Sequence, residues 1–164
     1  MPPRVYLAGP DVFHPDHARI FAERAAICRR YGLEPLIPMD NAATTAPEIY
    51  ESNVRLLQQC DAVIANVTPF RGPNCDVGTA WEMGYVAARG MPVFAFSEAR
   101  GALLDRIPDA KPANVDSAGM AVEDFGLGEN LMIALSVVDR TIHATFEAAA
   151  AAAARHPHSR RATC

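Results

Sequence analysis

Short apolar runs alternate with helical segments along most of the chain, and this alternation constrains the fold more than any other feature of the sequence. The clearest run covers residues 61–67, and a loop rich in Gly and Pro follows it. Strands that alternate with helices pair in parallel through right-handed crossovers. We therefore predict an α/β fold: a doubly wound (Rossmann- or flavodoxin-like) parallel sheet of five strands, with helices on both faces. The expected strands cover 5–8, 35–37, 61–67, 92–96 and 137–142, and the expected helices cover 17–31, 47–60, 77–89, 130–136 and 145–155.

The chain of 164 residues, half of them hydrophobic, is long enough for one domain with its own core. We expect this domain to span residues 1–155. Residues 156–164 are polar and contain Pro157, so a flexible C-terminal tail is expected there. Residues 97–126 have no periodic pattern and predict a long loop with short structured pieces, which in a compact domain is usually functional or mobile.

Composition narrows the class of partner. The net charge of −4 argues against a nucleic-acid backbone, because proteins that bind duplexes usually present a dense basic face. No apolar stretch reaches the roughly 20 residues that span a bilayer, and the N-terminus does not resemble a signal peptide, so no membrane partner is expected. The four cysteines have neither CxxC nor zinc-ligand spacing, which predicts reduced thiols in a cytoplasmic protein without a metal site.

Three loops that follow strands are unusually rich in Gly, Pro, Asp and Asn: residues 9–11, 38–40 and 68–76. In a doubly wound sheet, ligands bind at the carboxyl ends of the strands. The sequence therefore predicts a ligand site where these three loops meet.

The helix after the third strand carries the most interesting carboxylate. Glu82 lies four residues after Gly78, so both share one helix face, and the glycine is expected to open space over the carboxylate. A solvated carboxylate, or an ion pair with Arg89, is the plainer interpretation. Asp76 suits the N-cap of this helix, although a carboxylate at a strand end can also bind a ligand hydroxyl.

Three residues near the first strand are also candidates. Tyr6 can be a core residue, yet a buried phenol needs a hydrogen-bond partner, and a carboxylate near the neighbouring strand could serve. Asp11 and Phe13 can be turn and packing residues, or a polar and aromatic wall for a base. No GxGxxG, Walker or GxSxG motif is present, so carboxylates are the main chemical resource. Carboxylate nucleophiles are typical of glycosyl transfer.

Segments 5–13, 38–41 and 61–84 together, with a weaker match at 130–132, resemble the nucleoside 2-deoxyribosyltransferase family. The resemblance implies that Glu82 is the nucleophile, that Tyr6 orients its carboxylate, and that Asp76 holds a deoxyribose hydroxyl. It also implies that Asn130 reaches the sugar in a neighbouring subunit's site. The implied substrate-binding residues are Gly9, Pro10, Asp11, Phe13, Asp40, Asn53, Gly78, Asn130 and Met132.

The resemblance implies exchange of the nucleobase of 2′-deoxynucleosides through a covalent deoxyribosyl–Glu82 intermediate, with retention of configuration and slow hydrolysis when water is the acceptor. The implied partners are 2′-deoxynucleosides and free nucleobases, in a homo-oligomer built from dimers and without a metal or organic cofactor. One position departs from the family pattern. Asn53 stands where many members have an aspartate that contacts the leaving base, and an amide cannot donate a proton as a carboxylic acid does.

Two other functions stay open. The first is an N-glycosidase for 2′-deoxynucleoside 5′-monophosphates, which needs a phosphate pocket. Asn130, in place of a serine, argues against it, whereas Arg71 is in its favour. The second is a non-catalytic nucleoside- or nucleotide-binding module of the same fold.

Overall fold

In the computed structural model, which describes residues 1–38, 43–110 and 113–157, five parallel strands form one sheet in the order β2-β1-β3-β4-β5. The change of direction in this order falls between β1 and β3, where doubly wound folds bind ligands. The predicted α/β architecture is confirmed. The strands are β1 (Arg4–Ala8), β2 (Glu34–Leu36), β3 (Ala62–Asn66), β4 (Val93–Phe96) and β5 (Ile142–His143).

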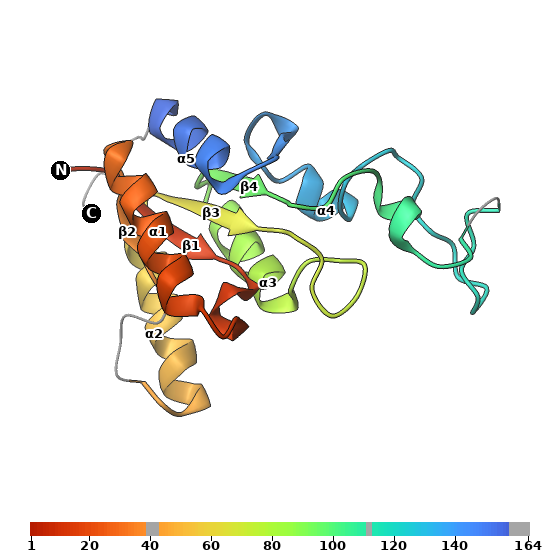
Figure 1. Cartoon of the computed structure of the whole chain (residues 1–164), viewed down its shortest axis with the longest axis horizontal. Helices are drawn as coiled ribbons and strands as arrows, with labels where there is room; N and C mark the ends of the chain where they lie inside the picture. The colour runs from red at the N-terminus through yellow and green to blue at the C-terminus, as the bar shows by residue number, and fades with distance from the viewer. Residues whose placement is uncertain (39–42, 111–112, 158–164) are drawn as a thin grey trace.

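Helices cover both faces of the sheet, as Figure 1 shows. The helices α1 (His17–Arg30) and α5 (Phe146–Arg155) pack on one face, whereas α2 (Ala46–Gln59) and α3 (Val77–Ala87) pack on the other. A short helix, α4 (Leu131–Ala134), contacts α3. Three 3-10 turns complete the regular structure: η1 (Pro10–Phe13), η2 (Leu103–Arg106) and η3 (Val138–Arg140).

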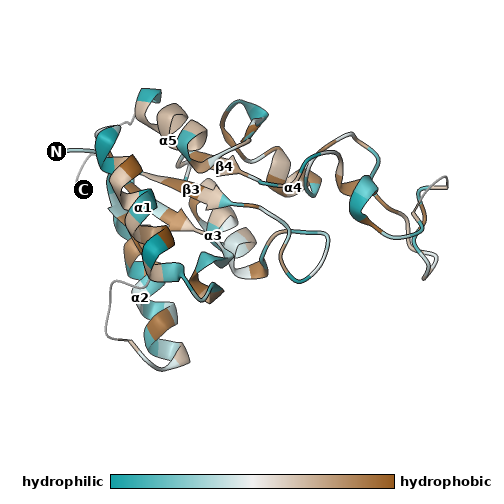
Figure 2. Ribbon diagram, in the orientation of Figure 1, coloured by the Kyte–Doolittle hydropathy of each residue, from teal (hydrophilic) through white to brown (hydrophobic). Residues whose placement is uncertain are grey.

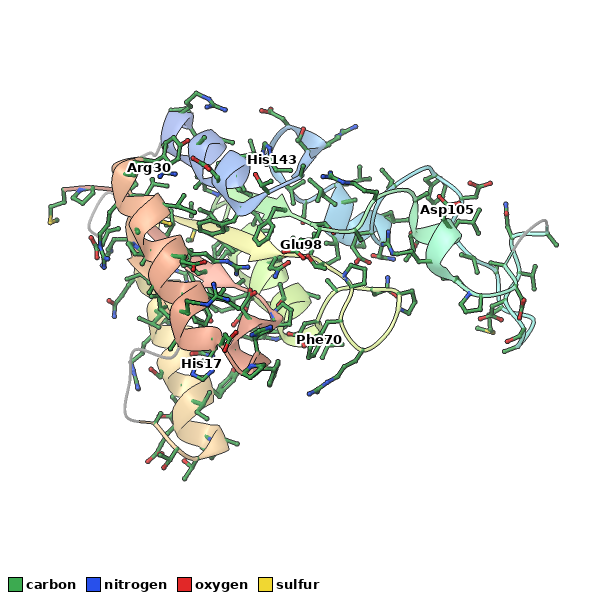
Figure 3. The ribbon with its side chains drawn as sticks, viewed as in Figure 1. His17, Arg30, Phe70, Glu98, Asp105 and His143 are labelled. Atoms are coloured by element: carbon green, nitrogen blue, oxygen red, sulfur yellow. The ribbon has the colours of Figure 1, made fainter. Side chains whose placement is uncertain are left out.

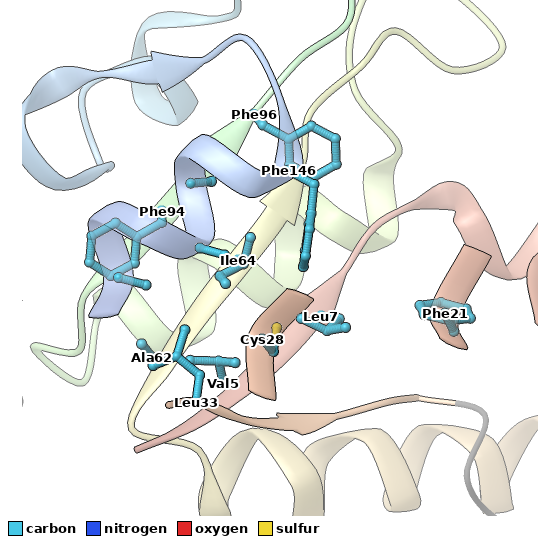
Figure 4. Close-up of a cluster of buried hydrophobic side chains, with 13 residues drawn as sticks. Val5, Leu7, Phe21, Cys28, Leu33, Ala62, Ile64, Phe94, Phe96 and Phe146 are labelled. Carbon is cyan, nitrogen blue, oxygen red and sulfur yellow. The ribbon is translucent and has the colours of Figure 1, made fainter. Parts of the chain in front are cut away.

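Alternation along each central strand divides the core into two layers. In β1, Val5 and Leu7 point toward α1 and α5, whereas Tyr6 and Ala8 point toward α2 and α3. Figure 4 shows the first of these layers, in which Phe94 packs with Val5 and Leu7 around β3. Burying one large aliphatic or aromatic side chain contributes roughly 1.5–3 kcal/mol, so these layers hold the sheet and its helices together. Figure 2 shows apolar residues on the central strands β3 and β4.

Helix ends follow from local sequence signals. The α1 helix ends at Arg30, and Gly32 turns the chain after it with a φ of 74° that suits glycine. Thr45 and Glu48 form a capping box at the start of α2. The Thr145 hydroxyl accepts a hydrogen bond from the amide of Ala148 at the start of α5.

The expected strand over 137–142 is wrong in extent. Its first part is the η3 turn, and only residues 142 and 143 pair with β4. Asp139 and Arg140 have φ values of 53° and 51°, which a strand cannot contain. The expected helix over 130–136 is likewise shorter, because Asn130 is its N-cap and the helix stops at Ala134.

The segment between β4 and α4 extends away from the sheet, toward the right of Figure 1. As expected, its described residues form short pieces, the η2 turn and an isolated antiparallel bridge between Val115 and Ala121. At the other end of the chain, the His156 ring packs edge-on against Phe94, with ring centroids 5.6 Å apart, so residue 156 still belongs to the packed domain. Residues 158–164 of the expected tail lie outside the described residues. Within the part of the chain that the structure describes, no helix has both the length and the apolar character needed to cross a bilayer.

Candidate active site

Tyr6 and Glu82 meet on the α2–α3 face of the sheet. The Tyr6 hydroxyl donates a hydrogen bond of 2.6 Å to Oε1 of Glu82. The phenol is completely buried beneath α3, and its pKa is raised by burial first and by the negative charge of Glu82 second. Because this pKa lies above the ordinary value of a tyrosine, the phenol is protonated at neutral pH and donates to the carboxylate.

Burial also perturbs the carboxyl group of Glu82, raising its pKa to about 7. The hydrogen bond from Tyr6 opposes this rise because it stabilises the charged form, whereas the nearby charge of Asp76 adds to it. A carboxylate with such a pKa is ionised in part of the molecules at neutral pH. It is poorly solvated, which makes it a stronger base and nucleophile than an exposed glutamate.

Asp76 caps α3 one and a half turns before Glu82. Its Oδ2 accepts hydrogen bonds from the backbone amide of Thr79 (3.0 Å) and from the Thr79 hydroxyl (3.2 Å). Oδ1 of Asp76 has no hydrogen bond to a described residue, so it can accept one from a ligand. A Cβ at Gly78 would lie 3.0 Å from Oδ2 of Asp76, so the glycine makes room for the capping carboxylate. That Gly78 also opens space over Glu82 stays a prediction.

Arg89 does not pair with Glu82. Its guanidinium donates to the hydroxyl of Tyr85 (3.1 Å) and lies over the ring of that residue. The Tyr85 ring stacks on Trp81, and Trp81 contacts Tyr50 of α2. Glu82 therefore has the neutral Tyr6 as a hydrogen-bond partner and no cationic partner among the described residues. Its negative charge can then stabilise a positive charge that develops on a substrate.

Asn53 is half-buried on α2. Its Oδ1 atom is inaccessible to solvent and has no hydrogen-bond partner among the described residues. A buried carbonyl oxygen without a donor costs roughly 1–3 kcal/mol, so this atom is a ready acceptor for an N–H group. Asp40, which the sequence also suggested, lies outside the described residues.

Asp11 is held on the opposite face of the sheet. Its carboxylate forms an ion pair with Arg24 and accepts hydrogen bonds of 3.1 and 3.2 Å from the Asn66 side chain. Gly9 allows this arrangement, because a Cβ there would lie 2.6 Å from Asp11 and 2.8 Å from Asn66. These contacts favour a role for Asp11 in fixing the η1 turn over a role in contacting a nucleobase. Pro10 is the first residue of this turn.

Replacing Asp11 with asparagine should lower the free energy of unfolding by about 3 kcal/mol, since the buried guanidinium of Arg24 would lose its counter-charge. Asp16→Asn removes an exposed carboxylate near Arg19 and should cost less than about 1 kcal/mol. Urea unfolding of the two variants measures the difference. If Asp11→Asn unfolds like the wild type yet has a raised KM, the carboxylate contacts substrate instead.

Phe13 forms an exposed aromatic shelf with the loop after β3. Its ring stacks on Phe70 with centroids 5.4 Å apart, and the guanidinium of Arg71 lies over both rings. Figure 3 shows Phe70 on this loop, at the carboxyl edge of the sheet. An exposed aromatic shelf of this kind can stack a nucleobase.

Asn130 and Met132 lie at the start of α4. The Asn130 side chain accepts a hydrogen bond from the amide of Met132 (3.0 Å) and donates one to Glu123 (2.7 Å). Met132 is exposed. The amide group of Asn130 keeps one further N–H that can reach beyond its own chain.

Sequence reasoning missed the residue next to it. Glu129 is almost completely buried, and its carboxylate binds the loop that leads into α3. Arg24 and Asn66, the partners of Asp11, were missed as well. The pattern of charged residues gave no signal for any of them, because glutamate and arginine are usually exposed.

The fold and the hydrogen-bonded pair of Tyr6 and Glu82 define an α/β protein with an acidic site beside the point where the strand order reverses, between β1 and β3. A family model described as nucleoside 2-deoxyribosyltransferase matches residues 5–132. The chain therefore belongs to the nucleoside 2-deoxyribosyltransferase family, as the motifs suggested.

A solved structure agrees with this assignment. The chain is similar to a 2-deoxyribosyltransferase from Leishmania mexicana, with a TM-score of 0.82, 36% identity, and coverage of 95% of this chain and 99% of that one. A conserved protein from Enterococcus faecalis V583 shares the fold, with a TM-score of 0.57, 20% identity, and coverage of 92% and 96%. An uncharacterised protein of Schizosaccharomyces pombe is 38% identical over 105 residues, which are 58% of this chain and 50% of that protein. The chain thus spans about half the length of this curated relative.

Proposed function

We propose that this protein exchanges the nucleobase of 2′-deoxynucleosides. The observation that carries the proposal is the pair formed by Tyr6 and Glu82, in which a half-buried carboxylate is oriented by one short hydrogen bond and is ionised only in part at neutral pH. In a member of this family, such a group suits nucleophilic attack at an anomeric carbon.

The reaction we propose is a double displacement. A Glu82 oxygen forms a bond to C1′ of the sugar while the C1′–N bond breaks and its electron pair leaves with the base. A nitrogen of a second base then attacks C1′ from the original face, and the carboxylate leaves. Two inversions give retention, and water in place of the second base gives slow hydrolysis.

Other residues would position the sugar and the base. Asp76 can accept a hydrogen bond from a deoxyribose hydroxyl through the oxygen that its cap leaves free. The unpartnered Oδ1 of Asn53 can accept from an N–H of the base, although it cannot supply the proton that the leaving base needs. That proton would come from solvent or from a carboxylic acid such as Asp40.

A second candidate is hydrolysis of 2′-deoxynucleoside 5′-monophosphates. Arg71 favours it, because this cation is held above Phe13 and Phe70 and has no ion-pair partner among the described residues. A guanidinium in this position could bind a phosphate.

A chromatographic base-exchange assay separates the candidates. The purified protein is incubated with a 2′-deoxynucleoside and a different free base, and separately with a 2′-deoxynucleoside 5′-monophosphate and no acceptor. A new nucleoside in the first mixture supports the proposal. Release of base from the monophosphate alone supports the second candidate, and no turnover in either mixture contradicts both and leaves a binding module.

We further propose that Asn130 completes the site of a neighbouring subunit in a dimer-based oligomer. Asn130→Ala should impair exchange several-fold, through one lost hydrogen bond worth roughly 0.5–1.5 kcal/mol. Reassembling it with the Glu82→Ala variant should create sites with both intact residues, one from each chain. The activity of the mixture should then exceed the sum of the parents, with each parent reassembled alone as the control. Mixed oligomers without such recovery would place the action of Asn130 within its own chain.

A further inference from the structure

Glu129 is the most completely buried carboxylate among the described residues, with 1% of its surface exposed. Its Oε1 accepts hydrogen bonds from the side-chain amide of Asn74 (2.6 Å) and from the backbone amide of Asn130 (2.9 Å). Its Oε2 accepts one from the backbone amide of Cys75 (2.8 Å). One side chain therefore joins the loop before α3 to the start of α4.

A second contact joins the same two segments. Arg106 of the η2 turn donates to the carbonyl oxygen of Pro73 (3.1 Å) and to that of Gly128. Residues 73–75 are thus held through Arg106 on one side and Glu129 on the other. The loop that leads into α3 is fixed by the segment that extends from the sheet, and not only by its own turn.

The two joined segments carry the residues that the proposed function places around the sugar. Cys75 directly precedes Asp76, whose carboxylate starts α3, and Asn130 follows Glu129 in the chain. Resting on that proposed function, we propose that Glu129 is a positioning residue that sets Asp76 and Asn130 in one geometry. Glu129 thereby couples the position of Asp76, which is proposed to bind the sugar in its own subunit, to the position of Asn130 at the start of α4.

A carboxylate is required at this position, because all three of its partners are donors. In a Glu129→Gln variant, the amide NH₂ must face either the N–H of Cys75 or the N–H of Asn130. Turning the Asn74 side chain cannot relieve this conflict, since both of these backbone groups remain donors. At least one buried N–H then loses its acceptor, and the segment that carries it shifts.

The test compares Glu129→Gln with Asp124→Asn, which removes a charge from an exposed side chain of the same segment. Among the described residues, the Asp124 side chain accepts a hydrogen bond from Asn114 alone. The fall expected in kcat/KM for base exchange is about tenfold for Glu129→Gln, carried mainly by kcat, because positioning acts on the transition state. Asp124→Asn should match the wild type. Absence of exchange in the wild type would contradict the proposed function, whereas normal exchange by Glu129→Gln would overturn only this inference.

A double-mutant cycle distinguishes positioning from general loss of stability. If Glu129 acts through Asn130, adding Glu129→Gln to Asn130→Ala should cost clearly less than it costs the wild type. Equal costs in the two backgrounds would overturn the inference. Should Glu129→Gln fail to fold, Asn74→Ala removes only the side-chain bond to Oε1, and the same cycle is run with it. We expect a two- to threefold loss of kcat that shrinks in the Asn130→Ala background, and an unchanged kcat would overturn the inference.

Discussion

The Glu82→Gln variant should be folded and should lose base exchange by at least about 1,000-fold, because an amide cannot form the glycosyl ester that the proposed mechanism requires. The glutamine keeps the size of the side chain and can still accept the hydrogen bond from Tyr6. Exchange rates measured by chromatography at pH 8 provide the comparison. Near-normal turnover would show that another group attacks the sugar.

The same variant should be more stable than the wild type at high pH. Burial raises the pKa of Glu82 in the folded protein to about 7, above the 4.5 of an ordinary glutamate. The unfolded chain therefore loses this proton first, and the wild-type free energy of unfolding falls as pH rises from about 4.5 through about 7. At pH 8 the glutamine variant should be the more stable by about 2–3 kcal/mol, and at pH 4 the two should be nearly equal. Urea unfolding at both pH values tests this sign.

The second large effect is expected for Tyr6→Phe. The hydrogen bond from Tyr6 lowers the pKa of Glu82, so its removal should raise that pKa further above 7. Because the nucleophile must be ionised, exchange should fall as pH falls through this pKa, and the acidic limb of the kcat/KM profile should move to higher pH. A hydrogen bond to a charged group contributes about 1.5–3 kcal/mol. We therefore expect kcat/KM of Tyr6→Phe to be lower than that of the wild type by roughly 10- to 150-fold at pH 6, and by less at pH 9.

Tyr85→Phe is the matched control for this experiment. Tyr85 lies three residues after Glu82 on α3, and its hydroxyl contacts Arg89 and Gln58 instead of the carboxylate. Its loss should leave the pH profile unchanged. A Tyr6→Phe profile that coincides with the wild type would mean that the phenol does not control ionisation of Glu82.

Much of the architecture could be predicted because strand signals in this chain are local. The apolar stretch that forms β3 and the turn at Gly32 mark their elements without help from distant residues. The N-cap role of Asp76 was predictable in the same way, since the capping bond joins residues three apart. The contact between Tyr6 and Glu82 joins residues 76 positions apart, and only the family resemblance implied it.

The remaining features depend on tertiary contacts that no local pattern encodes. The pairing of Asp11 with Arg24 and Asn66, on the other face of the sheet from Glu82, is one such feature. The burial of the Glu129 carboxylate could not be predicted from the sequence, because its partners at 74 and 75 lie more than 50 residues away along the chain. The strand β5 is short because residues 139 and 140, just before it, have positive φ values that a strand cannot contain. Residue type alone does not reveal these φ values.

The most direct test of the account is to trap the glycosyl-enzyme. The intact protein is mixed with a 2′-deoxynucleoside in the absence of an acceptor base, quenched in acid, digested and analysed by mass spectrometry. The account predicts one added deoxyribosyl group on the peptide that contains Glu82, its loss when a free base is added before the quench, and no adduct in Glu82→Gln. Rapid base exchange without an adduct, or an adduct on a different residue, would contradict the central claim that Glu82 is the nucleophile.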